Sequence, residues 1–291
     1  MNNKMNNDRK EYYMGFPKGT YAEVLNGMAQ TDVYSHETSS IPLTAFWNPE
    51  NLGRIQSILE PHVPGITLED DLKFWEFPTE PVLRGVVCSD RPSMTDLMIW
   101  HPNVWQIAIE AKYTEYVRAL VQTIGEWLNE KRKKHRHVLP YRNILRAWVE
   151  MIRNAKCTDI SMTDFYRNCM GVGYQFLHRA ASACFKTNGP EGSTPVLVYQ
   201  LFYKKDDAEH VARMESFKAD LRKWAKLLGL KNMKFLIVSV PVTNAEEVGE
   251  KYGDLKGNAA RSLFAKMKTE DVYRFDFDGV SVETVVDKEA R

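Results

Sequence analysis

Two apolar segments joined by a long amphipathic helix occupy the last third of the sequence and constrain the fold more than any other feature. Residues 195–203 and 233–240 are apolar runs of strand length, and residues 207–228 between them repeat apolar side chains at helical spacing. Strands joined by such a crossover helix pair in parallel in a buried sheet, almost always with a right-handed connection. The pattern therefore predicts an α/β fold with a central, partly parallel sheet.

A second pair of strands is predicted near residue 100. Segments 95–100 and 104–113 are apolar and flank residues 101–103, a His-Pro-Asn triplet typical of turns. Strands joined by so short a connection pair antiparallel. We therefore expect a β-hairpin here and a mixed sheet in the whole domain.

Helical periodicity fills much of the remaining sequence. Short helices are expected at 21–28 and 50–59, the second of them opened by an Asn-Pro pair. A mostly helical block follows the hairpin and ends with a helix at 174–185, and one more helix is expected at 258–267. The sheet is therefore expected to be flanked by helices.

Two further segments suggest strands of less regular form. Residues 72–87 are interrupted by Pro78 and Pro81, which predicts an irregular edge strand or two short strands. Near the end of the chain, an Asp-Gly pair stands between the apolar runs 272–277 and 280–286. This pair predicts a terminal hairpin formed by the two runs.

The sequence favours one domain. No internal repeat or low-complexity linker divides it, so residues 21–291 are assigned to a single domain with a helical insertion at about 115–170. The first residues are polar and rich in Asn, and residues 1–20 are expected to be mobile.

Composition excludes several classes of protein. The 291 residues include 39 Lys and Arg against 38 Asp and Glu, so any affinity for nucleic acid must come from local patches. No apolar run reaches about 18 residues and no signal-peptide core is present, which argues against membrane insertion and secretion. The four cysteines form no Cys-x-x-Cys pair and the seven histidines no His-x-x-x-His pair, so zinc sites and disulfides are not expected. We expect a cytoplasmic protein with reduced thiols.

Three charged residues converge on the predicted hairpin. Glu110 and Lys112 end its second strand and share one face, because side chains alternate along a strand. With a three-residue turn, Trp100 faces Val104. Asp96 then lies on the same face as Glu110, diagonal to it and about 7 Å away. Two carboxylates and a backbone carbonyl suit Mg²⁺, and a nearby lysine can position or help to deprotonate a bound water, which predicts hydrolysis of a phosphodiester.

These residues resemble the catalytic motif of the PD-(D/E)XK nuclease superfamily, which has the restriction-endonuclease-like fold. Pro92 stands four residues before Asp96, and Glu110-Ala111-Lys112 follows on the next strand. The resemblance implies a core in which a helix precedes three antiparallel strands. A second helix, here 174–185, and a parallel strand, here 195–203, would complete it.

The resemblance also implies roles for individual residues. Asp96 and Glu110 would be metal ligands together with the backbone carbonyl of Ala111, and Lys112 would be the catalytic lysine. Mg²⁺ or Mn²⁺ is the implied cofactor, and nucleic acid, with DNA expected, is the implied substrate. Many members carry a glutamine on the second core helix, where Gln175 is the candidate.

Several alternatives stay open at this point. Gln122 replaces Gln175 if the helix directly after the hairpin is the core helix, and Glu60 and Glu76 are candidates for a glutamate that many members carry on the first helix. The charged residues could instead form a surface ion-pair cluster. A member that keeps the fold without catalysis would bind nucleic acid or protein, and the sequence leaves open whether the chain forms a homodimer.

A basic run lies within the predicted insertion. Residues 131–137 read Lys-Arg-Lys-Lys-His-Arg-His, and such runs supply sequence-independent affinity for phosphate backbones. On a helix, Lys131, Lys134 and His135 would share one face and contact nucleic acid on the side of Asp96. The alternative is a solvated helix end, where the helix dipole favours positive charge.

Overall fold

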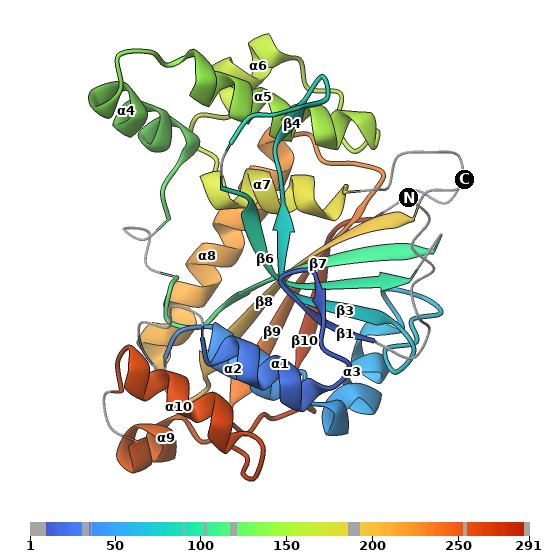
Figure 1. Cartoon of the computed structure of the whole chain (residues 1–291), viewed down its shortest axis with the longest axis vertical. Helices are drawn as coiled ribbons and strands as arrows, with labels where there is room; N and C mark the ends of the chain where they lie inside the picture. The colour runs from blue at the N-terminus through green and yellow to red at the C-terminus, as the bar shows by residue number, and fades with distance from the viewer. Residues whose placement is uncertain are drawn as a thin grey trace.

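Within the described residues, an eight-stranded mixed sheet forms the centre of the molecule (Figure 1). The structure is a computed structural model that describes residues 10–30, 35, 37–89, 91–101, 104–116, 121–185, 193–252 and 255–287. The strands lie in the order β10 (Ser281–Val286), β9 (Lys234–Val242), β8 (Thr194–Lys204), β7 (Trp105–Lys112), β6 (Ser93–His101), β3 (Leu72–Thr79), β1 (Glu11–Tyr13) and β2 (Phe16–Pro17). The connection from β3 to β6 carries a separate hairpin of β4 (Val82–Leu83) and β5 (Val86–Val87).

Helices cover both faces of the sheet and confirm the predicted α/β class. One hydrophobic core includes α4 (Ile124–Lys134), α5 (Leu139–Asn154), α6 (Met162–Asn168), α7 (Tyr174–Ala183) and α8 (Ala208–Leu227). The other includes α1 (Tyr21–Met28), α2 (Ser40–Phe46), α3 (Leu52–Leu59), which follows a 3₁₀ turn at Pro49–Asn51, α9 (Ala245–Tyr252) and α10 (Asn258–Lys266). Along β7, Ala108 packs in the first core, whereas Ile107 and Ile109 pack in the second.

The βαβ unit of the last third is confirmed. β8 and β9 pair in parallel, and α8 connects them. The helix begins after Asp207, whose side chain accepts the backbone N–H of His210 as an N-cap. β7 pairs in parallel with the other side of β8, so β8 is an interior strand with a nearly continuous buried sequence.

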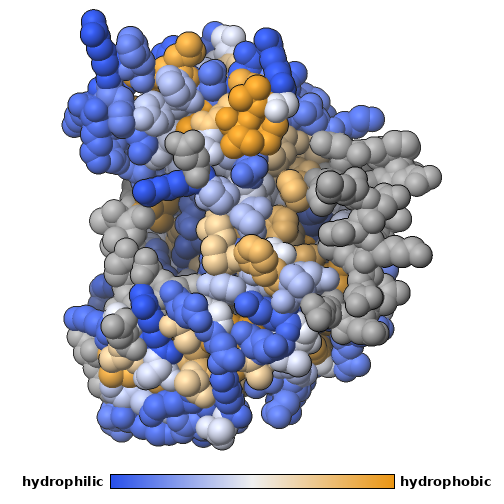
Figure 2. All heavy atoms as spheres, viewed as in Figure 1, coloured by the Kyte–Doolittle hydropathy of each residue, from blue (hydrophilic) through white to orange (hydrophobic). Residues whose placement is uncertain are grey.

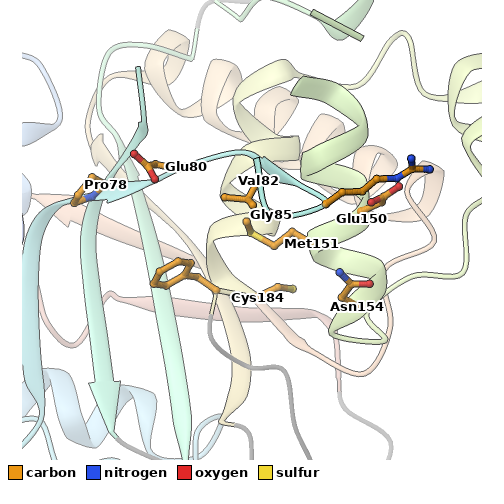
Figure 3. Close-up of a pocket in the computed structure, with 10 residues that line it drawn as sticks. Pro78, Glu80, Val82, Gly85, Glu150, Met151, Asn154 and Cys184 are labelled. Atoms are coloured by element: carbon orange, nitrogen blue, oxygen red, sulfur yellow. The ribbon is translucent and has the colours of Figure 1, made fainter. Parts of the chain in front are cut away.

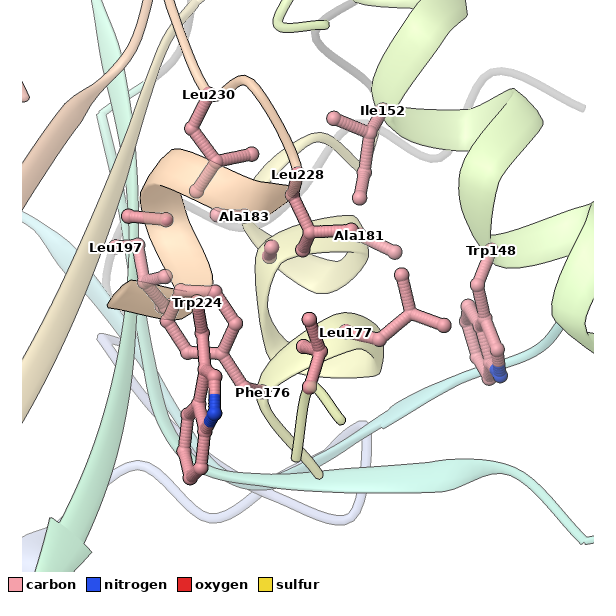
Figure 4. Close-up of a cluster of buried hydrophobic side chains, with 14 of the residues drawn as sticks. Trp148, Ile152, Phe176, Leu177, Ala181, Ala183, Leu197, Trp224, Leu228 and Leu230 are labelled. Carbon is pink, nitrogen blue, oxygen red and sulfur yellow. The ribbon is translucent and has the colours of Figure 1, made fainter. Parts of the chain in front are cut away.

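α7 is fixed between the sheet and the helices around it. Its Leu177 and Phe176 lie in one apolar cluster with Trp224 of α8 and Trp148 of α5 (Figure 4). The N-cap residue, Gly173, allows a close approach of Trp224, since a Cβ there would lie 2.9 Å from the indole ring. This packing determines which side chains of α7 point toward β7.

The segment 72–87 differs from the prediction. β3 is an interior strand, antiparallel to β6 and parallel to β1, and the two short strands β4 and β5 form a hairpin outside the sheet. Pro78 pairs with Met94 in the β3–β6 ladder, whereas β1 pairs with residues 73–75, short of this position. The half of β3 that contains Pro78 has one partner strand, and a missing N–H is tolerated there.

The predicted terminal hairpin is wrong. β10 pairs antiparallel with β9, and residues 272–277 form no strand, although Phe275 makes a single bridge to Val242. Without β10, the buried strand β9 would be an open edge of the sheet. Pairing with β10 satisfies the backbone groups on that side of β9. This gain outweighs the local preference of an Asp-Gly turn.

Residues 10–20 also differ from the expected mobile segment. β1 joins the sheet beside β3, and β2 folds back on β1. Tyr12 stacks on Phe74 with ring centroids 4.5 Å apart, so burial of an aromatic pair fixes this segment. Residues 1–9 lie outside the described residues.

The described part of segment 115–170 carries α4, α5 and α6, where the helical insertion is expected. Figure 1 shows these helices gathered at one end of the molecule, with α9 and α10 at the other end. None of the described helices combines the length and the apolar character needed to span a bilayer. All four cysteines lie in the described part of the chain and none forms a disulfide there; Cys88 is half-buried and the other three are buried.

Candidate active site

Asp96 and Glu110 lie opposite each other on β6 and β7. The ladder pairs Trp100 with Gln106 and ends with Leu97 opposite Ile109, and one further step places Asp96 opposite Glu110. The predicted diagonal arrangement is therefore wrong by two residues. A shift of two residues keeps both carboxylates on one face, because side chains alternate with a period of two.

The register differs because the turn begins later than predicted. His101 pairs with Trp105 as the last residue of β6 and does not belong to the turn. Its Nδ1 lies 2.7 Å from Oδ1 of Asp71, and its ring packs against Trp105. Residues 102 and 103 of the predicted turn lie outside the described residues.

Asp96 also contacts the backbone of the motif. Its Oδ2 accepts the N–H of Ala111 at 2.7 Å. The N–H and C=O of one strand residue project toward the same neighbouring strand, so the carbonyl of Ala111 also points to the side of Asp96. The end of the hairpin therefore places a carboxylate beside a backbone carbonyl.

Glu110 is the centre of a charged cluster and is 1% exposed. Its Oε1 accepts hydrogen bonds from Lys112 Nζ at 2.6 Å and from Gln175 Nε2 at 2.5 Å. Its Oε2 accepts a hydrogen bond from Nε of Arg179. Gln175 and Arg179 are one helical turn apart on α7 and therefore reach the same carboxylate.

Of the two glutamine candidates, the structure brings Gln175 to this cluster. Gln122 lies before α4, where its Nε2 donates to Oε2 of Glu130 at 2.7 Å. The helix that follows β7 directly is therefore not the helix that covers Glu110.

Arg179 is held by a second contact besides Glu110. Its Nη1 donates to Ser93 Oγ at 2.6 Å and lies 3.3 Å from Nδ1 of His178. Since an arginine can only donate, this Nδ1 is the acceptor nitrogen of His178. The hydroxyl of Ser93 lies 2.6 Å from the same Nδ1 and donates to it. Together with Glu110, these contacts hold the Arg179 side chain in one orientation.

A third carboxylate, Glu76, comes from β3. The β3–β6 ladder pairs Trp75 with Leu97 and Phe77 with Thr95, which places Glu76 between them, in line with Asp96. Its φ of 47° is unusual for a residue with a side chain and marks local strain. Glu60 lies elsewhere, at the end of α3, where its Oε1 accepts the N–H of Gly65. We call Glu76, Asp96, Glu110, Lys112, Gln175 and Arg179 the Glu110 cluster.

The three carboxylates of the Glu110 cluster differ in pKa, because burial acts on all of them but the nearby positive charges act most strongly on Glu110. Burial raises the pKa of Asp96 well above its usual range, and Glu110 adds to the shift. Burial likewise raises the pKa of Glu76 to about 7. Burial alone would raise the pKa of Glu110 too, but Arg179 and Lys112 outweigh it and lower that pKa. The cluster therefore favours an ionised Glu110 and resists ionisation of the other two acids.

The donor atoms of the cluster fit a hard divalent cation. Asp96, Glu110 and the carbonyl of Ala111 offer oxygen, the ligand type that Mg²⁺ and Mn²⁺ prefer. Among the described residues, no three His, Cys, Asp or Glu side chains are grouped so that they could hold a metal ion. Two carboxylates would therefore need the backbone carbonyl and water molecules to complete the coordination. Arg179 occupies one of the two acceptor positions of Glu110 Oε2, which leaves one for a ligand bond.

The basic run does not present the expected face. α4 ends at Lys134, and His135 has an extended backbone, so the three basic side chains do not share one helical face. Lys134 Nζ is paired with Glu130 at 2.5 Å, whereas Lys131 Nζ lies 5.7 Å from the ring centre of Trp127. The ring of Trp127 stacks on Tyr174, the residue before Gln175, at 4.3 Å. Lys131 is thus connected to α7 through an aromatic pair.

Sequence reasoning did not identify Arg179, Ser93 or His178 as members of the site. The four-residue spacing of Gln175 and Arg179 was the available signal for the arginine, because such residues share a helix face. Ser93 and His178 can be assigned to the site only from the structure, in which β6 contacts α7. No local pattern marks them.

A cavity of about 790 Å³ lies between the β4–β5 hairpin, α5 and the end of α7 (Figure 3). Its lining mixes apolar residues with Glu80, Arg84 and Glu150, and it includes no residue of the Glu110 cluster. An apolar patch covers the same region of the surface in Figure 2, where Val82 and Val86 of the hairpin are exposed. This cavity is separate from the candidate active site.

Comparisons with known proteins identify one family. A family model described as a domain of unknown function, DUF6946, matches residues 20–247, which contain the Glu110 cluster and the strands β3 to β9. No curated protein and no solved structure matches the chain. Because the family model covers well over half of the sequence, the chain belongs to the DUF6946 family.

Proposed function

We propose that this protein is a metal-dependent nuclease of the PD-(D/E)XK type that hydrolyses phosphodiester bonds of nucleic acid, with DNA as the expected substrate. One observation carries the proposal, namely the single cluster at the end of β6 and β7 that contains Asp96, Glu110, Lys112 and Gln175. Such hydrolysis needs oxygen ligands for a cation and a positive charge near the scissile phosphate, and the cluster supplies both.

The order of the elements supports the proposal. The restriction-endonuclease-like core has a helix, three antiparallel strands, a second helix and a parallel strand. The chain runs through α3, then the antiparallel strands β3, β6 and β7, then α7, and then β8, which is parallel to β7. Helices α4 to α6 extend the connection between β7 and α7 without changing this order.

Asp96, Glu110 and the carbonyl of Ala111 would hold the cation. Bound Mg²⁺ or Mn²⁺ supplies a Lewis acid that polarises the phosphate and lowers the pKa of a water molecule. Gln175 and Arg179 fix the carboxylate of Glu110 in one orientation, so that its position does not depend on solvent.

Lys112 acts as a fixed positive charge. Burial alone would lower its pKa, but the attraction of Glu110 and of neighbouring acids outweighs burial and raises it. The side chain therefore stays an ammonium group, which suits stabilisation of negative charge on the phosphate better than the removal of a proton from water.

The test is a cleavage assay on single- and double-stranded DNA and RNA with Mg²⁺, Mn²⁺ or EDTA. Lys112→Met is the critical variant, and Lys73→Met is its matched control. Both lysines are buried and pair with a glutamate, but Lys73 pairs with Glu11, away from the cluster. We expect metal-dependent cleavage that Lys112→Met abolishes and Lys73→Met retains. Cleavage that persists in EDTA and in Lys112→Met would reject the proposal.

A second candidate function is nucleic-acid binding without catalysis. The ion pair between Arg179 and Glu110 favours it, because the arginine already neutralises the carboxylate that a cation would use. This function predicts salt-dependent DNA binding and no binding of Mg²⁺ or Mn²⁺. Isothermal titration with either ion separates the two functions.

A further inference from the structure

A smaller cavity of about 280 Å³ adjoins the Glu110 cluster. Its walls come from residues 89 and 91–94 at the start of β6, from α5 and from α7. Two of its lining residues, Ser93 and Arg179, are bonded to each other, and Arg179 also contacts Glu110. An occupant of this cavity would therefore lie next to the proposed site of hydrolysis.

We propose that this cavity receives one unpaired nucleobase of the substrate, so that the enzyme acts on single strands or at unpaired nucleotides. The inference rests on the proposed function, since it places the base beside the phosphate that would be cleaved. Four features of the cavity support it: its aromatic wall, its charge, its size and its rigid support.

Aromatic rings form one wall of the cavity. Tyr174 and His178 of α7 have ring centroids 5.1 Å apart, and Trp148 of α5 lies 6.0 Å from His178. Ile144 and Met94 add apolar surface. The rings are not coplanar, with interplanar angles of 73° between Tyr174 and His178 and 45° between His178 and Trp148, so a base would stack on one ring and contact the others at an angle. Stacking on one aromatic ring binds bases of any sequence, because every base has a π-face.

The charge of the cavity suits a phosphate attached to the base. Arg91 is exposed just before β6, whereas Arg179 is buried and paired with Glu110, so the accessible positive charge of this cavity is that of Arg91. None of the described lining residues is acidic. The larger cavity differs in this respect, because Glu80 and Glu150 line it.

The size of the cavity limits what it can hold. A volume of about 280 Å³ is at the lower end of the range for small-ligand pockets. A space of this size matches one nucleobase better than a longer stretch of nucleic acid. A base in an intact duplex would first have to leave the helical stack, which costs a few kcal/mol.

The aromatic wall is supported from behind. Trp127 of α4 stacks on Tyr174 with an interplanar angle of 15°. Lys131 Nζ lies 5.7 Å from the ring centre of Trp127. The α4 helix therefore holds the wall and carries a positive charge beside it, which gives part of the basic run a role in the approach of a single strand.

The test is equilibrium binding in EDTA, where no cleavage is expected. The probe is a labelled DNA oligonucleotide that contains the fluorescent base 2-aminopurine, presented as a single strand and as a blunt duplex. Four variants of the full chain are compared, and thermal unfolding verifies that each is folded. Tyr174→Ala removes part of the aromatic wall, Met94→Trp fills the cavity, Arg91→Ala removes its outer charge, and Arg84→Ala is the charge-matched control on the neighbouring hairpin.

We expect the wild type to bind the single strand more tightly than the duplex and to quench the 2-aminopurine signal. Tyr174→Ala and Met94→Trp should weaken single-strand binding about 10-fold and leave duplex binding unchanged, because stacking on an aromatic side chain contributes about 1–3 kcal/mol per base. Arg91→Ala should lower the log-log salt slope by about one unit, and Arg84→Ala should not.

Equal affinity for single strand and duplex, with the same behaviour of Arg91→Ala and Arg84→Ala, would overturn the inference. Parallel cleavage assays with Mg²⁺ distinguish its failure from that of the proposed function. Cleavage without quenching, unchanged in Tyr174→Ala and Met94→Trp, rejects the base pocket and keeps the nuclease. Quenching and single-strand preference without any cleavage reject the nuclease and keep the pocket.

Discussion

The sheet carries two clusters of buried charge, and they differ in how the charges are balanced. On the face opposite the Glu110 cluster, Lys73 lies 3.8 Å from Glu11, which also accepts a hydrogen bond from Trp75. Asp71 pairs with His101 at 2.7 Å. We call Glu11, Asp71, Lys73 and His101 the Lys73 cluster, and each of its carboxylates has its own basic partner.

The Glu110 cluster has no such one-to-one pairing. Three carboxylates share two cations, and Glu110 alone accepts hydrogen bonds from Lys112, Gln175 and Arg179. A structural ion pair needs only to be neutral, whereas the second and third acids of this cluster are costly to ionise unless a further cation joins them. The comparison indicates that burial of charge alone does not mark a functional site, and that an unbalanced cluster beside a cavity is the more specific sign.

The largest expected effect is on catalysis. Asp96→Asn keeps the size of the side chain and an oxygen for the N–H of Ala111, but it removes a metal ligand. We expect Mg²⁺-dependent cleavage to fall by about 10³-fold, because a lost electrostatic contact in an active site costs this much. Asp71→Asn makes the same chemical change in the Lys73 cluster and should retain cleavage. Equal losses in both variants would remove the distinction between the clusters.

The next effect concerns stability. Arg179→Met leaves Glu110 with one cation in a buried site, and loss of one partner of a buried ion pair costs about 3–5 kcal/mol. Urea unfolding measures the change. The double variant Arg179→Met with Glu110→Gln should recover part of the loss, because the uncompensated charge is gone. Lys73→Met should cost less, since Lys73 lies 3.8 Å from Glu11 and makes no hydrogen bond to it, whereas Arg179 is hydrogen-bonded to Glu110. A larger loss in Lys73→Met would contradict this ranking.

The pH dependence of stability gives a third comparison. Burial raises the pKa of Glu76 from 4.5 to about 7, so the folded state binds more protons than the unfolded state between these values. The free energy of unfolding should therefore fall as the pH rises from about 4.5 to 7, by on the order of 3 kcal/mol. In EDTA, Glu76→Gln should reduce this slope and leave the part that Asp96 contributes through its own raised pKa, while the exposed control Glu80→Gln keeps the full slope. A wild-type slope in Glu76→Gln would show that other groups determine it.

The smallest expected effect concerns the basic run. Lys131 is adjacent to the aromatic wall of the site, whereas Lys251 of α9 is at the far end of the molecule (Figure 1). Lys131→Ala should lower the salt slope of DNA binding by about one unit, and Lys251→Ala should not change it. Lys134→Ala should have less effect than Lys131→Ala, because Lys134 is already paired with Glu130. Equal salt slopes in all three variants would support the alternative that the basic run is only a solvated helix end.

Local patterns predicted the parts of the fold that local energies determine. The βαβ unit and helices such as α7 and α10 follow from periodicity over ten or more residues. The face shared by Asp96, Glu110 and Lys112 follows from strand alternation and survives the error in register. The register was not predicted, because it pairs His101 with Trp105, and His101 also contacts Asp71, 30 residues away in the sequence.

The remaining parts depend on contacts that the sequence does not reveal. β10 pairs with β9 because an open edge of the sheet is available, and no local signal opposes the competing hairpin. Arg179 and Glu76 reach the cluster through the packing of α7 and a strained residue in β3. The sequence therefore predicted the acidic pair, its lysine and Gln175, and it named Glu76 only as a candidate on the first helix, whereas Arg179 was not predicted.

The central claim is that the Glu110 cluster binds a divalent cation, and calorimetric titration with Mg²⁺ or Mn²⁺ tests it most directly. We predict saturable binding to the wild type that releases protons, because the pKa values of Asp96 and Glu76 are raised by burial. Asp96→Asn should abolish binding and Asp71→Asn should retain it. A wild-type protein that binds neither ion, or an Asp96→Asn variant that binds as tightly as the wild type, would contradict the claim.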